Sequence, residues 1–319
     1  MAGQQPPAKT PADGSNGGQG GKGASFDPET DIRPYDDATE ALRAMNSYYN
    51  AVNLGDFERA YGYWRNPPQS LDEFRQGYAD TAYSIGTFEA ASDIDAAAGS
   101  RHQLVAAVIR AKLNDGTEQL FSGCYAMYRA APGVSDDPAD ELWRIDEASI
   151  APADSNAAIR ALLDAGCQPW ADRVAHYDAP YDNRTGSINV VYSLYDAVNR
   201  KDFDRAYGYW EQPPASKDDF IAGYADTAST AITVGAPADR GAAAGSVYDE
   251  VPIVLQATKT DGTVQRFSGC YVLRRANVPT PGHDDPTTNP WGIYSAQIAP
   301  APLDADIAVL LRDGCTNTP

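Results

Sequence analysis

Histidine and methionine are scarce in this chain, and basic residues are outnumbered by acidic ones. The 319 residues include 3 His and 3 Met, and 25 Lys and Arg stand against 44 Asp and Glu, for a formal net charge of −19. A surface that binds nucleic acid or an anionic membrane needs clustered Lys and Arg. The charge balance therefore argues against both partners and favours a solvated, acidic surface.

Long apolar runs are missing as well. A transmembrane helix needs roughly 18 or more consecutive apolar residues, and no stretch of the sequence approaches this, so we expect no membrane-spanning segment. Met1 to Ser25 are mostly Gly, Pro, Gln, Ser and Lys, and we predict a flexible leader over residues 1–33. No apolar core of a signal peptide is present. We hypothesise that Met1 replaces a natural signal peptide or a lipidated Cys.

The motifs of common catalytic and metal sites are also absent. The sequence has no phosphate-binding Gly loop, no Ser-His-Asp set and no HExxH motif. Its four cysteines form no CxxC pair, which argues against zinc and redox sites. We therefore predict no metal and no cofactor.

What the chain does contain is one long motif present twice. Residues 59–81 read RAYGYWRNPPQSLDEFRQGYADT, and residues 205–227 read RAYGYWEQPPASKDDFIAGYADT, 146 positions later. A match of this length indicates one structural unit that occurs twice. We predict two domains, at 34–168 and 180–316, joined by a linker at 169–179.

Each copy begins with helical patterns and continues with strands. In the first copy, apolar residues recur at helical spacing over 39–53. The pairs Asp115-Gly116 and Asp261-Gly262 predict hairpin turns between strands. A short helix at 156–165 is expected to close the first copy. This order predicts an α+β fold in which N-terminal helices pack on an antiparallel sheet.

The alternation in the strand at 266–274 separates its two faces. One set should face the core: Phe267, Gly269, Tyr271 and Leu273. The other set should face the outer surface: Arg266, Ser268, Cys270, Val272 and Arg274.

Three local stretches carry a resemblance to a known family. They are YNAVN at 49–53, GDFERAY at 55–61 and FSGCY at 121–125. With the helix and strand order, they resemble the nuclear transport factor 2-like superfamily, also called the cystatin-like cone. The second copy looks like uncharacterised bacterial cell-envelope members of that superfamily. The resemblance implies two tandem cone-shaped domains, each with helices packed on a curved antiparallel sheet.

The four cysteines fall at matched positions in the two copies. Cys124 and Cys270 lie in the middle of a strand, and Cys167 and Cys315 follow the last helix. We predict the disulfides Cys124–Cys167 and Cys270–Cys315; four buried free thiols are the alternative. Disulfides persist in oxidising compartments, so the expected location is the periplasm or cell surface, with a lipid anchor in the full-length precursor as one form.

Aromatic residues gather in both copies and admit two interpretations. They line an open cone that takes a small apolar ligand, as cavities of the superfamily do, or they form the core between helices and sheet. Their recurrence in both copies favours the core. The candidate ligand-binding residues are Tyr49, Tyr63, Trp64, Tyr78, Tyr195, Tyr209, Trp210 and Tyr224.

Enzymes that resemble this fold, such as ketosteroid isomerase, polyketide cyclases and scytalone dehydratase, place Asp, His and Tyr inside the cone. No His recurs here at equivalent positions. Asp80 and Asp226 are the repeated acids that we consider as a general base, against the simpler interpretation of surface or helix-terminal residues.

We therefore predict a non-catalytic binding or interaction module of the bacterial cell envelope. Its partner would be a small apolar ligand or another envelope protein. The alternative is an isomerase, cyclase or dehydratase that uses Asp80 or Asp226 with a Tyr.

The linker is short enough to hold the two domains side by side at high effective concentration. We predict an intrachain pseudo-dimer, with contact through the outer sheet faces; two domains that move independently on a flexible linker are the alternative.

Overall fold

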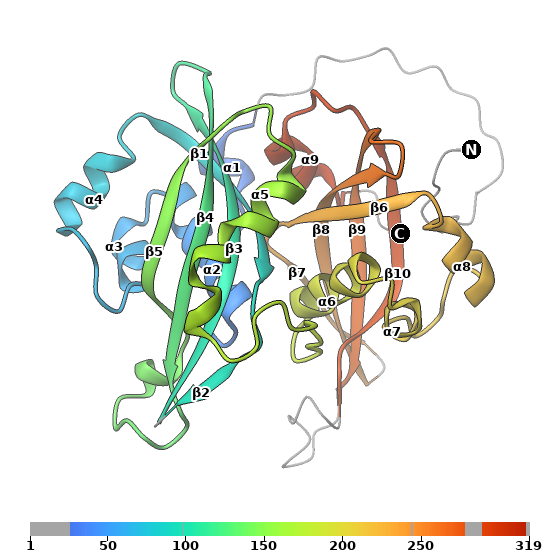
Figure 1. Cartoon of the computed structure of the whole chain (residues 1–319), viewed down its shortest axis with the longest axis horizontal. Coiled ribbons are helices and arrows are strands. Elements are labelled where there is room, and N and C mark those ends of the chain that lie inside the picture. Colours follow the sequence, from blue (N-terminus) through green and yellow to red (C-terminus); the bar gives the residue numbers. More distant parts are fainter. Residues whose placement is uncertain (1–25, 98, 244, 278–288, 317–319) are drawn as a thin grey trace.

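The computed structural model describes residues 26–97, 99–243, 245–277 and 289–316 (Figure 1). Helices precede an antiparallel sheet in each half of the chain, which confirms the predicted α+β class. The first half runs from the start of the described residues to residue 179, and the second half follows it. No helix in the described ranges is both long and apolar enough to cross a membrane.

The first half contains these elements in chain order: α1 (Pro28–Asp31), α2 (Ala41–Asn53), α3 (Phe57–Gly62), α4 (Leu71–Gly77), β1 (Thr81–Ala90), β2 (Asp95–Ala97), β3 (Ser100–Leu113), β4 (Glu118–Ala130), η1 (Pro138–Glu141), β5 (Arg144–Ala153), α5 (Ile159–Gly166) and η2 (Gln168–Arg173).

The second half repeats the pattern: α6 (Ser187–Asn199), α7 (Phe203–Tyr207), α8 (Lys217–Gly223), β6 (Thr227–Val234), β7 (Ala238–Ala243), β8 (Ser246–Lys259), β9 (Val264–Ala276), β10 (Gly292–Ala301) and α9 (Ile307–Asp313).

Each half has one five-stranded sheet. The strand order is β1-β3-β4-β5 in the first half and β6-β8-β9-β10 in the second, with the short strands β2 and β7 paired to β3 and β8. The predicted hairpin turns are present, with Gly116 at φ 86° and Gly262 at φ 83°, a region that glycine enters at little cost. α4 begins at a capping box in which Ser70 and Glu73 satisfy each other's main-chain N–H groups.

Both faces of each sheet are covered. The N-terminal helices pack on one face, and the last helix of each half, α5 or α9, lies on the other. The predicted disulfides Cys124–Cys167 and Cys270–Cys315 are confirmed, and they tie β4 to the end of α5 and β9 to the end of α9.

The cover over the outer face corrects one prediction. Tyr271 and Leu273 face the core as expected, but Cys270 and Val272 on the opposite face are also buried. For Cys270, burial follows from its disulfide to the end of α9. The alternation therefore assigned the two faces correctly but did not show that both faces lose contact with water.

Two predicted boundaries also shift. Residues 26–33, expected as the end of the leader, include α1 and contact the second half through an ion pair of Asp31 with Arg312. Residues 169–179, expected as a linker, pack on the first half: Trp170 is buried, and the Asp178 N–H donates to the Ala91 carbonyl at 2.8 Å. The remainder of the predicted leader, residues 1–25, lies outside the described residues.

The two halves meet through side chains at equivalent positions. Three hydrogen bonds each join residues that are 146 positions apart: Arg43 with Asn189 (3.4 Å), Asn46 with Tyr192 (3.0 Å) and Thr87 with Thr233 (2.6 Å). Contacts between equivalent residues occur where a twofold axis passes between two copies of a unit. The halves are therefore arranged about a pseudo-twofold axis.

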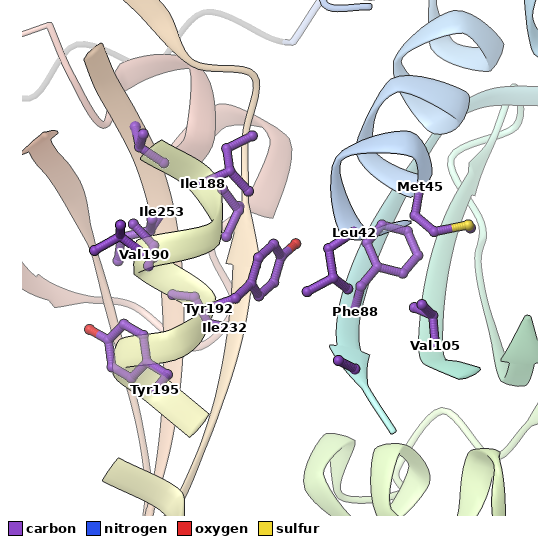
Figure 2. Close-up of a cluster of buried hydrophobic side chains, with 14 of the residues drawn as sticks. Leu42, Met45, Phe88, Val105, Ile188, Val190, Tyr192, Tyr195, Ile232 and Ile253 are labelled. Atoms are coloured by element: carbon purple, nitrogen blue, oxygen red, sulfur yellow. The ribbon is translucent and has the colours of Figure 1, made fainter. Parts of the chain in front are cut away.

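The surface used for this contact differs from the one expected. α2 and β1 of the first half face α6 and β6 of the second, and Tyr192 of α6 extends toward Leu42 of α2 (Figure 2). The outer sheet faces are occupied by α5 and α9, which the helix pattern alone could not place.

Removing either disulfide should lower stability. The bonds close loops with sequence separations of 43 and 45, for which loop entropy gives about 4 kcal/mol each. We expect Cys124→Ser/Cys167→Ser and Cys270→Ser/Cys315→Ser to lower the free energy of unfolding by similar amounts in urea titrations. A loss below about 1 kcal/mol in both variants would contradict this, and mass spectrometry of unreduced peptides checks the pairing independently.

Candidate functional site

Most of the predicted ligand-binding aromatics lie in the cores of the two halves. Tyr63, Tyr195 and Tyr209 are at most 6% exposed. The Tyr49 hydroxyl lies 2.7 Å from the Tyr125 hydroxyl, and Tyr195 and Tyr271 form the equivalent pair at 2.8 Å. Such pairing satisfies hydroxyl groups that burial removes from water.

Burial also fixes the protonation state of these groups. Loss of solvation raises the pKa of Tyr49 and of Tyr125 far above that of an exposed tyrosine, so both stay neutral. Two further hydroxyls bind acids near the start of each half: Tyr63 donates to Asp36, and Tyr209 donates to Asp182 at 2.7 Å. These contacts support core packing rather than an open cone.

The remaining predicted aromatics have the same role. Trp64 and Trp210 each form a bridge with the last strand of their sheet, at Ile145 and Ile293. Two more residues, Tyr78 and Tyr224, form stacked ring pairs with Phe57 and Phe203, at 6.0 Å between centroids in both copies.

Asp80 and Asp226 lie where α4 and α8 lead into β1 and β6. Asp80 is exposed, and its carbonyl accepts the Asn114 N–H at 2.8 Å. The Asp226 carboxylate pairs with the Lys259 ammonium at 2.7 Å. Neither acid lines any of the cavities described below. The hydroxyl of Tyr78 hydrogen-bonds to that of Tyr48, 3.2 Å away.

A cavity of about 250 Å³, called the open cavity below, lies between the halves. α2 and β1 form one wall, and β6, β8 and α9 form the other, while residues 26–33 cover the cavity on one further side. Residues that line it include Asn46, Tyr49, Gly86, Phe88, Val234, Gly235, Pro252, Ala308 and Leu311. Of the predicted ligand-binding residues, Tyr49 alone lines this open cavity.

The pseudo-twofold axis relates the open cavity to a second space that is almost filled. This filled counterpart has a volume of about 20 Å³. Ten residues around it are 146 positions from residues of the open cavity: Tyr35/Tyr181, Asn46/Tyr192, Tyr49/Tyr195, Asn50/Asp196, Asn53/Asn199, Ser84/Thr230, Gly86/Ile232, Phe88/Val234, Glu89/Gly235 and Ala90/Ala236.

One member of an ion pair, Glu89, lines the filled counterpart. Glu89 of β1 forms this pair with Arg160 of α5. Burial raises the pKa of Glu89 above its usual value, and the Arg160 guanidinium opposes this shift. In the second half, Gly235 stands at the position of Glu89, and Ala308, 148 positions after Arg160, stands at the position of the arginine. The open cavity thus lacks both members of the pair.

A difference in side-chain size in β1 and β6 has the same effect. Gly86 stands where the second half has Ile232, and the Phe88 ring lies across it: a Cβ at Gly86 would be 2.1 Å from the Phe88 Cζ atom. Asn46 similarly replaces the larger Tyr192.

The sequence contains a signal for these residues that the predictions above did not use. Gly86, Gly235 and Ala308 are places where the two copies disagree, a small residue standing opposite a large one. A comparison based on the residues that the two copies share leaves out such positions. These positions nevertheless line the open cavity.

The polar side chains in the walls of the open cavity mostly serve the fold. The Asn53 carboxamide donates to the Ser84 carbonyl at 2.8 Å and accepts the Ser84 N–H at 2.7 Å, which joins α2 to β1. The Asn50 carboxamide donates to the Arg33 carbonyl at 2.8 Å. Charge lies largely at the enclosing segment, where Asp31 and Arg312 are paired at 2.8 Å.

A third cavity of about 230 Å³ shares Tyr35 with the open cavity and has a more charged lining. Its Arg43 is paired with Asp37 at 2.8 Å and also donates to Thr185 of the second half at 3.0 Å. Within the described ranges, no cluster of three or more His, Cys, Asp or Glu has the arrangement of a metal site.

No protein-family model matches the chain, and a search of curated proteins finds no significant match. The role of the open cavity is therefore inferred from its geometry.

Gly86→Ala should be destabilising because the new methyl group overlaps the Phe88 ring. We expect a loss of roughly 1–3 kcal/mol in unfolding free energy, the usual cost of overpacking. Gly77→Ala is the matched control, since a Cβ there meets nothing within 4 Å. Chemical denaturation of both variants tests this. An equal effect at the two positions would show that the Phe88 ring moves aside to accept the new methyl group.

Proposed function

We propose that the chain is a non-catalytic binding module that holds a small, uncharged and largely apolar ligand in the open cavity. The observation that carries the proposal is the difference between two equivalent spaces, of about 250 Å³ and about 20 Å³. The same fold closes the space when Glu89, Arg160 and Ile232 are present. Glycine and alanine at the equivalent positions leave it open.

The size of the open cavity supports an occupant. Protein interiors contain few voids larger than a water molecule. The open cavity is partly open to solvent and has room for a small molecule. A ligand that binds only the folded state returns stability to the chain by mass action.

The lining indicates the chemistry of the ligand. Ile85, Phe88, Val234, Pro252 and Leu311 provide an apolar surface. The carboxamide of Asn46 adds a polar group, whereas the Tyr49 hydroxyl is already paired with Tyr125. The charged lining residues, Asp31, Arg33, Glu250 and Arg312, include the ion pair of Asp31 with Arg312. The net charge of −19 disfavours anions. An apolar body with one or two uncharged polar groups fits this lining best.

The location and family of the protein are part of the same proposal. Two disulfides persist best in an oxidising compartment, which supports a periplasmic or cell-surface protein of the bacterial envelope. The order of helices before an antiparallel sheet in each half supports membership of the nuclear transport factor 2-like superfamily. The arrangement about the pseudo-twofold axis supports a monomeric chain that acts as its own dimer.

Filling the open cavity should abolish binding. The variant Gly235→Glu/Pro252→Ala/Ala308→Arg transfers the ion pair of the filled counterpart, and Pro252→Ala removes the ring that a Cβ at Gly235 would meet at 2.9 Å. We expect the affinity for phenylnaphthylamine, an uncharged apolar probe, to fall by about tenfold or more in fluorescence titrations.

The reciprocal variant is the matched test. Glu89→Gly/Arg160→Ala removes the ion pair from the first half and should create a second binding site, so that the number of probe molecules bound per chain rises from one to two. Unchanged affinity in the filled variant, with its fold preserved by circular dichroism, would place binding elsewhere and refute the proposal.

A further inference from the structure

The segment that encloses the open cavity, residues 26–33, is called the strap below. Phe26, Asp31, Ile32 and Arg33 of the strap line the cavity. The Phe26 ring packs against the Tyr83 ring at 4.9 Å between centroids. The strap thus contributes apolar surface to the cavity and covers it on one side.

The strap has an equivalent in the second half that is attached differently. Residues 172–179 lie 146 positions further on and run along the first half. There the Asp178 N–H donates to the Ala91 carbonyl at 2.8 Å, and the Asp93 N–H donates to the His176 carbonyl at 3.1 Å. These main-chain hydrogen bonds form a short antiparallel bridge between Tyr177 and Ser92.

The strand edge beside the strap is built differently. β1 extends to Ala90, and the next residue, Ala91, still donates its N–H to the Leu104 carbonyl at 2.8 Å. β6 already ends at Val234, and the residue equivalent to Ala91 is Pro237, which has no N–H to donate. Within the described ranges, no main-chain hydrogen bond joins residues 28–33 to the second half.

An ion pair links residue 31 of the strap to the second half. The Asp31 carboxylate and the Arg312 guanidinium are 2.8 Å apart, with side-chain exposures of 20% and 19%. Arg312 is oriented by Asp313, whose carboxylate accepts from Nε at 2.7 Å. A partly exposed ion pair is a weak tie compared with paired main chain.

The other end of the strap is fixed. The Asn50 carboxamide binds the Arg33 carbonyl at 2.8 Å and accepts the Tyr35 N–H at 2.9 Å. If the ion pair of Asp31 and Arg312 breaks and the Phe26 ring leaves Tyr83, the chain before Arg33 can swing while the chain after it stays on α2.

We propose that the strap is the lid of the open cavity and that ligand enters and leaves when Asp31 separates from Arg312. This rests on the proposed function of the cavity. Opening moves Phe26 and Ile32 away from the ligand and leaves the walls formed by β1, β6 and α9 in place. The equivalent segment, held by main-chain pairing, stays closed over the first half.

Hydrogen exchange of the full-length chain without ligand tests the lid directly. We expect the amides of 28–33 to exchange faster than those of 174–178. Arg312→Gln should accelerate exchange in the strap by roughly two- to fivefold, the range that one partly exposed ion pair supports, and leave 174–178 unchanged. Equal protection of the two segments, or no effect of the substitution, would overturn the lid.

Binding kinetics provide the second test. A lid controls passage in both directions, so Arg312→Gln should raise the association and dissociation rate constants of phenylnaphthylamine together, with a smaller change in affinity. The charge exchange Asp31→Arg/Arg312→Asp should restore slow exchange. A rise in the dissociation rate alone would show that Arg312 only supports the wall and would contradict the lid. Failure of the wild-type chain to bind the probe would count against the proposed function, while hydrogen exchange still decides whether the strap opens.

Discussion

The hydrogen bond between Thr87 and Thr233 fixes how the two halves pack against each other, and the rest of the molecule depends on this packing. Both hydroxyls are buried and both belong to the same position of the repeated unit. Each finds its partner in the other, so a shift between the halves would leave two buried hydroxyl groups without a hydrogen bond. Asn46 and Tyr192 impose the same condition on α2 and α6. The halves are therefore held in one symmetric register.

This register creates the same space twice, once on each side of the axis. Symmetry alone would make both spaces alike, and the differences between the two copies make them unlike. Glu89, paired with Arg160, lines one space, and Gly235 and Ala308 line the other. The cavity is thus a property of the few positions where the repeat is imperfect.

The sequence allowed the fold class, the hairpin turns and both disulfides to be predicted. The first two depend on patterns local to one copy, and the disulfides followed from the matched positions of the cysteines in the two copies. Asp115-Gly116 needs no knowledge of the rest of the chain to predict a turn. The cavity could not be predicted in this way. Gly86 lines the cavity only because the second half packs beside β1, and its lack of a side chain makes room for the Phe88 ring; the first of these depends on contacts across the axis. The resemblance to the nuclear transport factor 2-like superfamily describes one copy at a time, so it indicated cone interiors and gave no reason to consider the space between the copies.

Joining the two units in one chain has a consequence for how such a site behaves on dilution. A site built between separate subunits vanishes when they dissociate, so its occupancy depends on protein concentration as well as on ligand. Here the covalent connection keeps the partner unit at high local concentration. It also frees each position to mutate on one side of the axis alone, whereas in a homodimer every substitution appears twice. Gly235 opposite Glu89 is an arrangement that two identical subunits could never adopt.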